Sequence, residues 1–318
     1  MSRSLGSART SWGPRWTVRT VVVASVITLA VASGVTALGA VVQNNTTTAG
    51  RATATRVVSL AEARTGSAHR APASDTGSTI DAPPAAPTVV FYGDSLAAES
   101  QDFFRSALNA AGITDIHSET FGGTAICDWL DNMRADAITL HPTAVVIEFS
   151  GNALTPCMKG TDGQPLSGEA YWERYLADAQ TAISIFAAAH SRIFVAGSPI
   201  SRVQEATGDF HGGLLNAIYE ELAGGHADVA AYVDAGAAVL DHGHWTATLP
   251  CLPNEPCTGG TDLRSRGVNV VRAPDGGHFC PASEAAKRGV VGACPVWSSG
   301  AFRYGNAMAT PVLAALGR

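Results

Sequence analysis

The sequence lacks several patterns that would place it in common functional classes. No Cys-x-x-Cys pair occurs among its six cysteines, which disfavours a zinc site. No Gly-x-Ser-x-Gly occurs, so the nucleophile elbow of α/β-hydrolases is absent. There is no internal repeat, and no long apolar run outside the predicted strands, helices and N-terminal segment. An enzyme for long-chain lipids, with an apolar cleft or lid, is therefore disfavoured.

Acidic residues are absent before Glu62, and the charge of the chain is unevenly spread. Residues 1–86 hold eight arginines and three acidic residues, a net charge of +5 within a total of -6, so the remainder carries -11. An acidic main domain argues against nucleic acid or anionic lipid as its ligand.

The N-terminus has the pattern of a targeting segment. Four arginines in residues 1–19 precede a charge-free apolar run of 23 residues, 20–42. As a helix this run would be about 34 Å long, enough to cross a bilayer core of about 30 Å with the basic side in the cytoplasm. Its length favours an uncleaved transmembrane anchor. Its Ser, Thr and Gly residues, with a small-x-small site near Ala37-Leu38-Gly39, favour a cleaved signal peptide.

Export agrees with the number and position of the cysteines. Residues 43–86 are rich in Ala, Thr, Ser, Gly and Pro, which predicts a disordered linker between the N-terminal segment and a domain at 87–318. All cysteines follow this linker. An even number in an exported domain predicts three disulfides, with fifteen possible pairings. The cysteines are Cys127, Cys157, Cys251, Cys257, Cys280 and Cys294.

From Pro87 onward, strand-like and helix-like runs alternate. Apolar strands without polar alternation, each followed by a helix, predict a parallel sheet covered on both faces. We therefore expect an α/β fold, a three-layer α/β/α sandwich with a five-stranded parallel sheet in flavodoxin-like order. The predicted strands are 88–92, 113–121, 144–150, 192–200 and 229–235. The predicted helices are 99–112, 127–140, 169–190, a helix near 211–223, and 297–316.

Ligands bind such sheets beyond the carboxyl ends of the strands, and the loops there hold distinctive residues. The first loop reads Gly93-Asp94-Ser95-Leu96, the second Gly122-Gly123 and the third Ser150-Gly151-Asn152. Far downstream, Asp275 and His278 stand at i and i+3 in "APDGGHFCP". In this combination and order, over 87–318, the chain resembles the SGNH (GDSL-type) hydrolase family.

The resemblance implies a Ser95–His278–Asp275 triad. A free serine hydroxyl is a poor nucleophile, so Ser95 at the start of a helix needs His278 as a base, oriented by Asp275. The oxyanion donors would be the N–H groups of Ser95 and Gly123 (chosen over Gly122 only for its place beside the helix start) and the Asn152 amide. No metal or organic cofactor is then required.

The third of these loops departs from the pattern of the SGNH family. It usually reads Gly-x-Asn-Asp, whereas this chain has Ser150-Gly151-Asn152-Ala153. The asparagine is retained, but the loop geometry is in question. This departure gives weight to a catalytically inactive binding module of the same fold.

The resemblance also suggests which cysteines pair. If the loops with Gly123 and Asn152 face one pocket, Cys127 and Cys157 could join them. A Cys280–Cys294 bond would hold the histidine loop, and Cys251–Cys257 would close a short loop in the 241–275 insertion.

Simpler roles exist for single residues. Ser95 could be only a helix N-cap, Asp94 is interpreted as a turn or helix-start residue, and His242 and His244 as loop residues rather than a metal pair.

For the whole chain we expect an exported serine esterase acting on short acyl groups. The alternative is an O-acyltransferase using the same serine on envelope glycans. The expected partners are an acyl ester or an acylated glycan or lipid, and the membrane through 20–42 if that segment is retained.

Overall fold

The computed structural model describes residues 86–208, 211–257, 267–280, 294 and 296–318. All of them belong to the compact unit Ser78–Arg318. The predicted basic N-terminus, the anchor or signal segment, and the linker except for its last residue lie outside the described residues. In the described part of the chain, no helix combines the length and apolarity needed to span a membrane.

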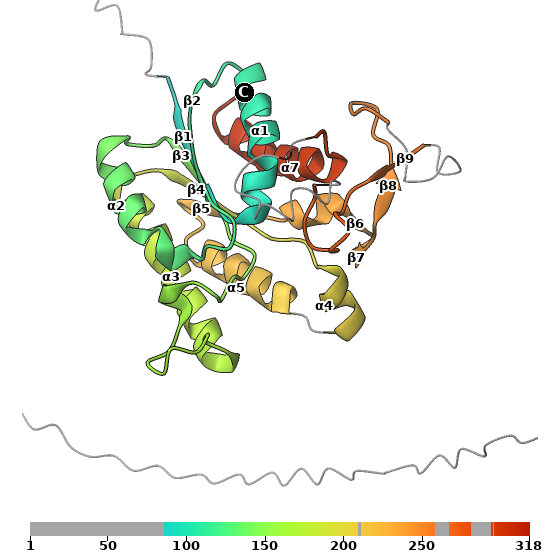
Figure 1. Cartoon of the computed structure of the whole chain (residues 1–318). Coiled ribbons are helices and arrows are strands. Elements are labelled where there is room, and N and C mark those ends of the chain that lie inside the picture. Colours follow the sequence, from blue (N-terminus) through green and yellow to red (C-terminus); the bar gives the residue numbers. More distant parts are fainter. Residues whose placement is uncertain (1–85, 209–210, 258–266, 281–293, 295) are drawn as a thin grey trace, which may run out of the picture. The chain divides into compact units, whose positions relative to one another are not determined.

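A five-stranded parallel sheet forms the centre of the domain (Figure 1). Its strand order is β2-β1-β3-β4-β5, the order of flavodoxin-like sheets. The strands are β1 (Thr88–Gly93), β2 (Asp115–Thr120), β3 (Ala144–Glu148), β4 (Arg192–Ala196) and β5 (Ala230–Val233).

Helices cover both faces of this sheet because its strands are apolar on both sides. Along β1, Val89 and Phe91 enter one core with α1 and α7, while Val90 and Tyr92 enter a second core with α2, α3 and α5. The helices are α1 (Ser95–Ala110), α2 (Leu130–Thr139), α3 (Gly168–Ala188), α4 (Arg202–Thr207), α5 (His211–Gly225) and α7 (Ser299–Ala315). Short 3₁₀ helices are η1 (Ile126–Asp128), η2 (Pro156–Met158) and η3 (Ala235–Val239).

Two small antiparallel hairpins follow the sheet in the chain. They are formed by β6 (Leu240–Asp241) with β7 (His244–Trp245), and by β8 (Thr248–Pro250) with β9 (Val268–Val270). The segment after β9 returns to the carboxyl edge of the sheet, and α7 closes the chain.

The predicted fold class is confirmed, with all five strands in the predicted parallel order. The fourth strand ends at Ala196 rather than at residue 200, and the first helix begins at Ser95 rather than at residue 99. The physical reason for the earlier helix start is Asp94, whose side chain accepts the Leu96 N–H at 3.0 Å and so caps the helix four residues earlier.

Candidate active site

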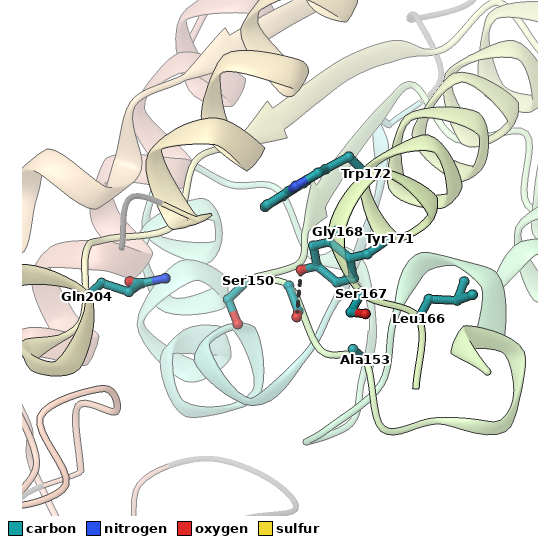
Figure 2. A pocket seen from close by; sticks show the side chains of 9 residues that line it. Ser150, Ala153, Leu166, Ser167, Gly168, Tyr171, Trp172 and Gln204 are labelled. Atoms are coloured by element: carbon teal, nitrogen blue, oxygen red, sulfur yellow. Dashed lines mark hydrogen bonds between the residues drawn. The ribbon is translucent and has the colours of Figure 1, made fainter. Parts of the chain in front are cut away.

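A pocket of about 280 Å³ lies where the chain leaves β3 (Figure 2). The loop after β3, the first turns of α3 and Gln204 of α4 line it, and no lining side chain is charged. The Tyr171 and Trp172 rings form part of the wall, with centroids 4.5 Å apart, and Tyr171 donates to the Gly151 carbonyl at 2.8 Å. The pocket is thus neutral, partly aromatic and held firmly to the third loop.

Asp94 joins that loop to the start of α1. Its carboxylate is fully buried, and Oδ2 accepts the Ser150 N–H at 2.7 Å, the Ser150 hydroxyl at 2.6 Å and the Asn152 amide at 2.8 Å. Ser150, which stands where the SGNH family that the sequence resembles usually has glycine, therefore adds a hydrogen bond to the loop. Asp94 does cap the helix, as predicted, but its larger role in holding the third loop was missed because it depends on a contact across 56 residues.

The Asn152 amide bridges the second and third loops. Besides Asp94, Nδ2 donates to the Thr124 carbonyl at 3.2 Å, so both N–H bonds of the amide have acceptors within the protein. Tyr175 in turn donates to the Asn152 carbonyl at 2.8 Å. The structure thus places Asn152 beside the start of α1, and both N–H bonds of its amide are used in hydrogen bonds within the protein.

Ser95 is the first residue of α1, directly beyond the carboxyl end of β1. The turn before it requires glycine, because a Cβ on Gly93 would lie 2.2 Å from the Ala97 Cβ and 2.6 Å from the Glu148 carbonyl oxygen. This close approach of β1, β3 and α1 leaves Ser95 half-buried at the edge of the sheet. The strand end therefore presents a hydroxyl at the place where parallel sheets bind ligands.

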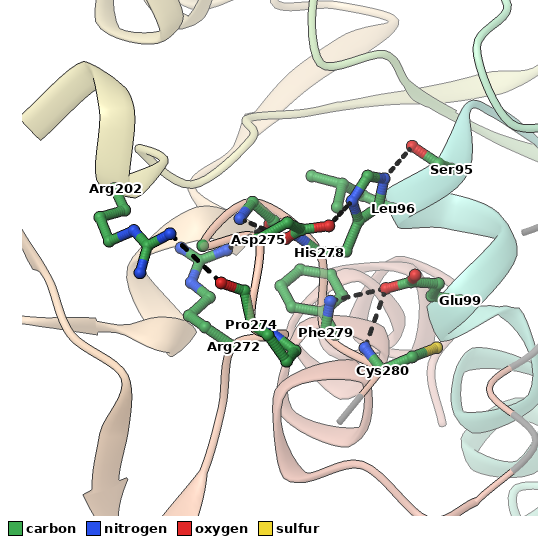
Figure 3. Close-up of polar contacts among 12 residues, drawn as sticks. Ser95, Leu96, Glu99, Arg202, Arg272, Pro274, Asp275, His278, Phe279 and Cys280 are labelled. Carbon is green, nitrogen blue, oxygen red and sulfur yellow. Dashed lines mark hydrogen bonds and ion pairs between the residues drawn. The ribbon is translucent and has the colours of Figure 1, made fainter. Parts of the chain in front are cut away.

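His278 and Asp275 meet Ser95 in a continuous chain of hydrogen bonds (Figure 3). His278 Nε2 lies 3.0 Å from Ser95 Oγ, and His278 Nδ1 lies 2.8 Å from Asp275 Oδ2. Contacts of this kind, from a hydroxyl to an imidazole and from the imidazole to a carboxylate, have the geometry of a Ser-His-Asp triad. The three residues predicted from sequence are thus brought together across 183 residues.

The loop that carries His278 is held from several sides. Asp275 Oδ1 accepts the N–H groups of Gly277 at 2.8 Å and His278 at 3.0 Å, so one carboxylate orients both ring and backbone. Arg272, which is 2% exposed, donates to the carbonyls of Gly277 and Ile200, both at 3.1 Å. The position of the imidazole is consequently determined by the loop as a whole.

The charges around His278 favour its protonated form. Burial alone would lower the pKa of His278, but the charge of Glu99 and then the hydrogen bond and charge of Asp275 raise that pKa above its ordinary value. For Asp275, burial opposes ionisation, yet hydrogen bonds from Gly277, His278 N–H and the His278 ring lower its pKa. Asp275 therefore stays ionised and holds the ring proton on Nδ1, which leaves the Nε2 lone pair for Ser95.

Free N–H groups lie beside the Ser95 hydroxyl. In the first turn of α1, the N–H of Leu96 donates to the Asp94 side chain, that of Ala97 to Glu148 Oε2 and that of Ala98 to the Asp94 carbonyl. The Ser95 N–H has no acceptor among the described residues. It is thus open to an incoming oxygen.

The second loop also holds N–H groups without acceptors in the described part of the chain, those of Gly122 and Gly123. Gly123 has a φ of 83°, which favours glycine, and a Cβ there would meet nothing within 4 Å. This geometry explains a glycine at 123 but does not distinguish the two residues as donors.

A buried acid, Glu148, contacts the turn that joins β1 to α1. It is fully buried at the end of β3 and accepts the Tyr304 hydroxyl at 2.9 Å and the Ala97 N–H at 3.1 Å. Burial and then the charge of Asp94 raise the pKa of Glu148 well above its usual range. Burial and the nearby Asp94 thus favour the neutral form of Glu148, which supports α1 through its hydrogen bonds. The sequence did not single it out, since it ends an ordinary apolar strand.

Three disulfides are present, Cys127–Cys157, Cys251–Cys257 and Cys280–Cys294, the pairings expected from the resemblance. The first joins η1 to η2 and therefore links the second loop to the third. The last lies two residues after His278 and anchors the histidine loop.

Breaking the Cys127–Cys157 bond is expected to cost more stability than breaking Cys251–Cys257. Loop closure over 30 residues predicts about 3.6 kcal/mol, against about 2.2 kcal/mol for a separation of 6 residues. Urea unfolding of the Cys127→Ser/Cys157→Ser and Cys251→Ser/Cys257→Ser proteins would measure both. Equal losses, or a larger loss for the second pair, would contradict this ranking.

Two groups of side chains have the spacing of possible metal ligands, but their cysteines form disulfides. In the described ranges, two groups of three possible ligands occur, Glu99 with Cys280 and Cys294, and Asp128 with Cys127 and Cys157. The cysteines of both are disulfide-bonded. His244 contacts Glu205 at 2.9 Å, and the His242 side chain is 96% exposed on the β6–β7 turn.

Comparison with known proteins finds likeness in structure. No protein-family model and no curated protein sequence matches the chain. A lipase/acylhydrolase from Enterococcus faecalis is 15% identical with a TM-score of 0.45, covering 72% of this chain and 96% of that one. A GDSL-like lipase from Bacteroides thetaiotaomicron is 11% identical with a TM-score of 0.43, covering 72% and 88%.

A catalytic mutant of the acetylxylan esterase Axe2 from Geobacillus stearothermophilus is also similar. It is 13% identical with a TM-score of 0.38, and the match covers 48% of this chain and 77% of that one. These likenesses concern the fold. One of these proteins is described as a GDSL-like lipase. The chemistry proposed below is derived from the side chains of this chain.

Proposed function

We propose that this chain is an exported serine esterase of the SGNH type. The observation that carries the proposal is the hydrogen-bonded chain from Ser95 through His278 to Asp275, with the Ser95 N–H open beside the hydroxyl. A serine that only capped its helix would not need a base 3.0 Å away. Asp94 already caps α1, which removes the simpler role of Ser95.

The reaction proceeds in two transfers. Ser95 Oγ attacks the ester carbonyl while His278 Nε2 takes the hydroxyl proton, and the imidazolium then gives this proton to the departing alcohol oxygen. In the second transfer, His278 takes a proton from water, the resulting hydroxide attacks the acyl-serine, and Ser95 regains its proton as the carboxylic acid leaves. Asp275 remains a carboxylate throughout and stabilises the imidazolium.

The developing oxyanion would be bound by main-chain N–H groups and one amide. Ser95 and Gly123 supply the first two. For Asn152, the oxyanion would replace the Thr124 carbonyl, the longer of the two amide contacts, while Asp94 keeps the amide in place. Losing one such donor typically costs about 10²–10³ in rate.

The pocket at the third loop is the proposed site of a short acyl group, although none of the triad residues lines it. Its volume of about 280 Å³ is at the lower limit of the roughly 300–1,000 Å³ of pockets for drug-sized ligands. It borders Ser150 and Gly151, directly before Asn152. Long acyl chains would extend beyond it.

Export is proposed on two grounds. Three disulfides require an oxidising compartment, and the basic, then apolar, N-terminal segment has the order of an anchor or a signal peptide.

Hydrolysis of p-nitrophenyl acyl esters of increasing chain length by the full chain, produced in an oxidising compartment, tests the function. We expect turnover that is greatest for acetyl and butyryl esters. Fluorophosphonate labelling followed by peptide mapping should identify Ser95. A folded, disulfide-bonded protein with no turnover and no label would overturn the proposal.

The pH dependence follows from the charges around His278. Because the pKa of His278 is raised and the base must be neutral, kcat/KM should fall as the pH drops through a midpoint above about 6.5, the ordinary imidazole value. A pH profile of kcat/KM for p-nitrophenyl acetate would measure this midpoint. A midpoint at or below the ordinary value would contradict the charge arrangement.

A further inference from the structure

Glu99 is a buried acid that the triad does not use. It lies on α1 one turn after Ser95 and is 1% exposed. Its Oε2 accepts the N–H of Phe279 at 2.6 Å and of Cys280 at 3.3 Å, the two residues after His278 (Figure 3). Helix α1 therefore carries both Ser95 and the carboxylate that binds the main chain directly after His278.

The other carboxylate oxygen of Glu99 has no hydrogen-bond partner among the residues that the structure describes. Among the described residues, no Lys or Arg pairs with this side chain. Anchoring the two N–H groups requires an acceptor, but it does not require a charge. Burial raises the pKa of Glu99, while the Phe279 N–H, a positive charge on His278 and the Cys280 N–H act to lower it. A positive charge that forms on His278 during the reaction would therefore favour the ionised form of Glu99.

That positive charge is the His278 imidazolium. Burial lowers the pKa of His278, and the charge of Glu99 is the largest single contribution that raises it, followed by the hydrogen bond and the charge of Asp275. Among the described residues, the other charged groups facing His278 or its loop come from four elements. They are Asp94 at the helix start, Asp275 on the loop itself, Arg272 after β9 and Arg202 on α4, which donates to the Pro274 carbonyl at 3.2 Å.

We infer that Glu99 is a positioning residue that holds His278 against Ser95 and stabilises the imidazolium formed when the serine proton moves to Nε2. No atom is exchanged with Glu99. The proton of Ser95 Oγ ends on His278, and the ionised Glu99 carboxylate supplies a negative charge from the helix that also carries the nucleophile. This inference rests on the proposed function, since it assigns the base role to His278.

An NMR titration of His278 in the full chain tests the charge directly and needs no enzymatic activity. The resonance is assigned by its loss in His278→Gln. We expect Glu99→Gln, which keeps an acceptor for the Phe279 N–H, to lower the His278 midpoint by about 0.5 pH unit or more. The matched control is Asp102→Asn, which removes one negative charge from an exposed site on the same helix and should leave the midpoint unchanged.

Kinetics supply the second readout. If the chain is an esterase, the acid limb of kcat/KM should move to lower pH in Glu99→Gln, with kcat reduced about threefold to tenfold above the midpoint. Glu99→Asp, which keeps the charge but retracts from the loop, should lower kcat without moving the midpoint by more than about 0.2 pH unit.

The outcomes separate the two proposals. An unmoved His278 titration in folded Glu99→Gln overturns this inference whether or not the protein has esterase activity. If Glu99→Gln does not fold, Glu99→Asp decides, because a midpoint lowered by about 0.5 pH unit with the charge retained would overturn it. Absence of ester hydrolysis by the wild type contradicts the esterase function, while a shifted titration would still support the electrostatic contact.

Discussion

Ser95→Ala is expected to lower kcat for p-nitrophenyl acetate by about 10⁴-fold or more, because it removes the nucleophile and leaves only the remaining pocket and N–H donors. The loss should appear in kcat rather than in KM. The helix should persist, since Asp94 supplies its N-cap and Ser95 makes no capping contact. Steady-state kinetics and thermal unfolding of wild type and variant measure both parts.

A matched control for this variant is Ser106→Ala, an exposed serine on the same helix α1. It should retain wild-type kcat. A Ser95→Ala protein that kept more than about one hundredth of the wild-type kcat would show that another group attacks the ester.

Asp275→Asn should cost about 10⁴-fold in kcat without unfolding the loop. The asparagine Oδ1 can still accept the N–H groups of Gly277 and His278, which the carboxylate now holds at 2.8 and 3.0 Å. Its amide, however, would donate to His278 Nδ1, so the ring proton would move to Nε2. The ring would then present a donor to Ser95 where a base is required.

The kcat of Asp275→Asn and its pH profile measure this effect, with Asp131→Asn on the exposed face of α2 as the control. Above the His278 midpoint the loss should be large and constant with pH. An activity within tenfold of the wild type would rule out Asp275 as the residue that sets the tautomer.

The fold could be predicted because its signals are local. Continuous apolar runs such as 88–92 and 144–150 predict buried parallel strands, and the structure has β1 and β3 there. The end of β3 was predicted two residues too late, since Phe149 is apolar and buried although it no longer pairs. Hairpins of two or three residues, such as β6–β7, are too short to leave a periodic pattern.

The candidate triad could be proposed from sequence because Ser95, Asp275 and His278 stand in short motifs at predicted loops. Their supports could not. In the sequence, Glu99 has the pattern of a solvent-exposed residue at the start of a helix, yet it is buried because the Phe279 loop returns onto α1 from 180 residues away. Arg272 likewise gives no signal, since its acceptors are two main-chain carbonyls.

The distance along the chain between Ser95 and His278 bears on biosynthesis. Ribosomes make the serine first, and 183 residues separate it from its base. All five strands of the sheet are complete by Val233, so a growing chain can build the scaffold while the nucleophile still lacks a base. His278 is made shortly before α7, the helix that covers the α1 face of the sheet. A chain truncated before His278 would be inert, and the proposed activity would begin only after the segment that carries His278 has been made.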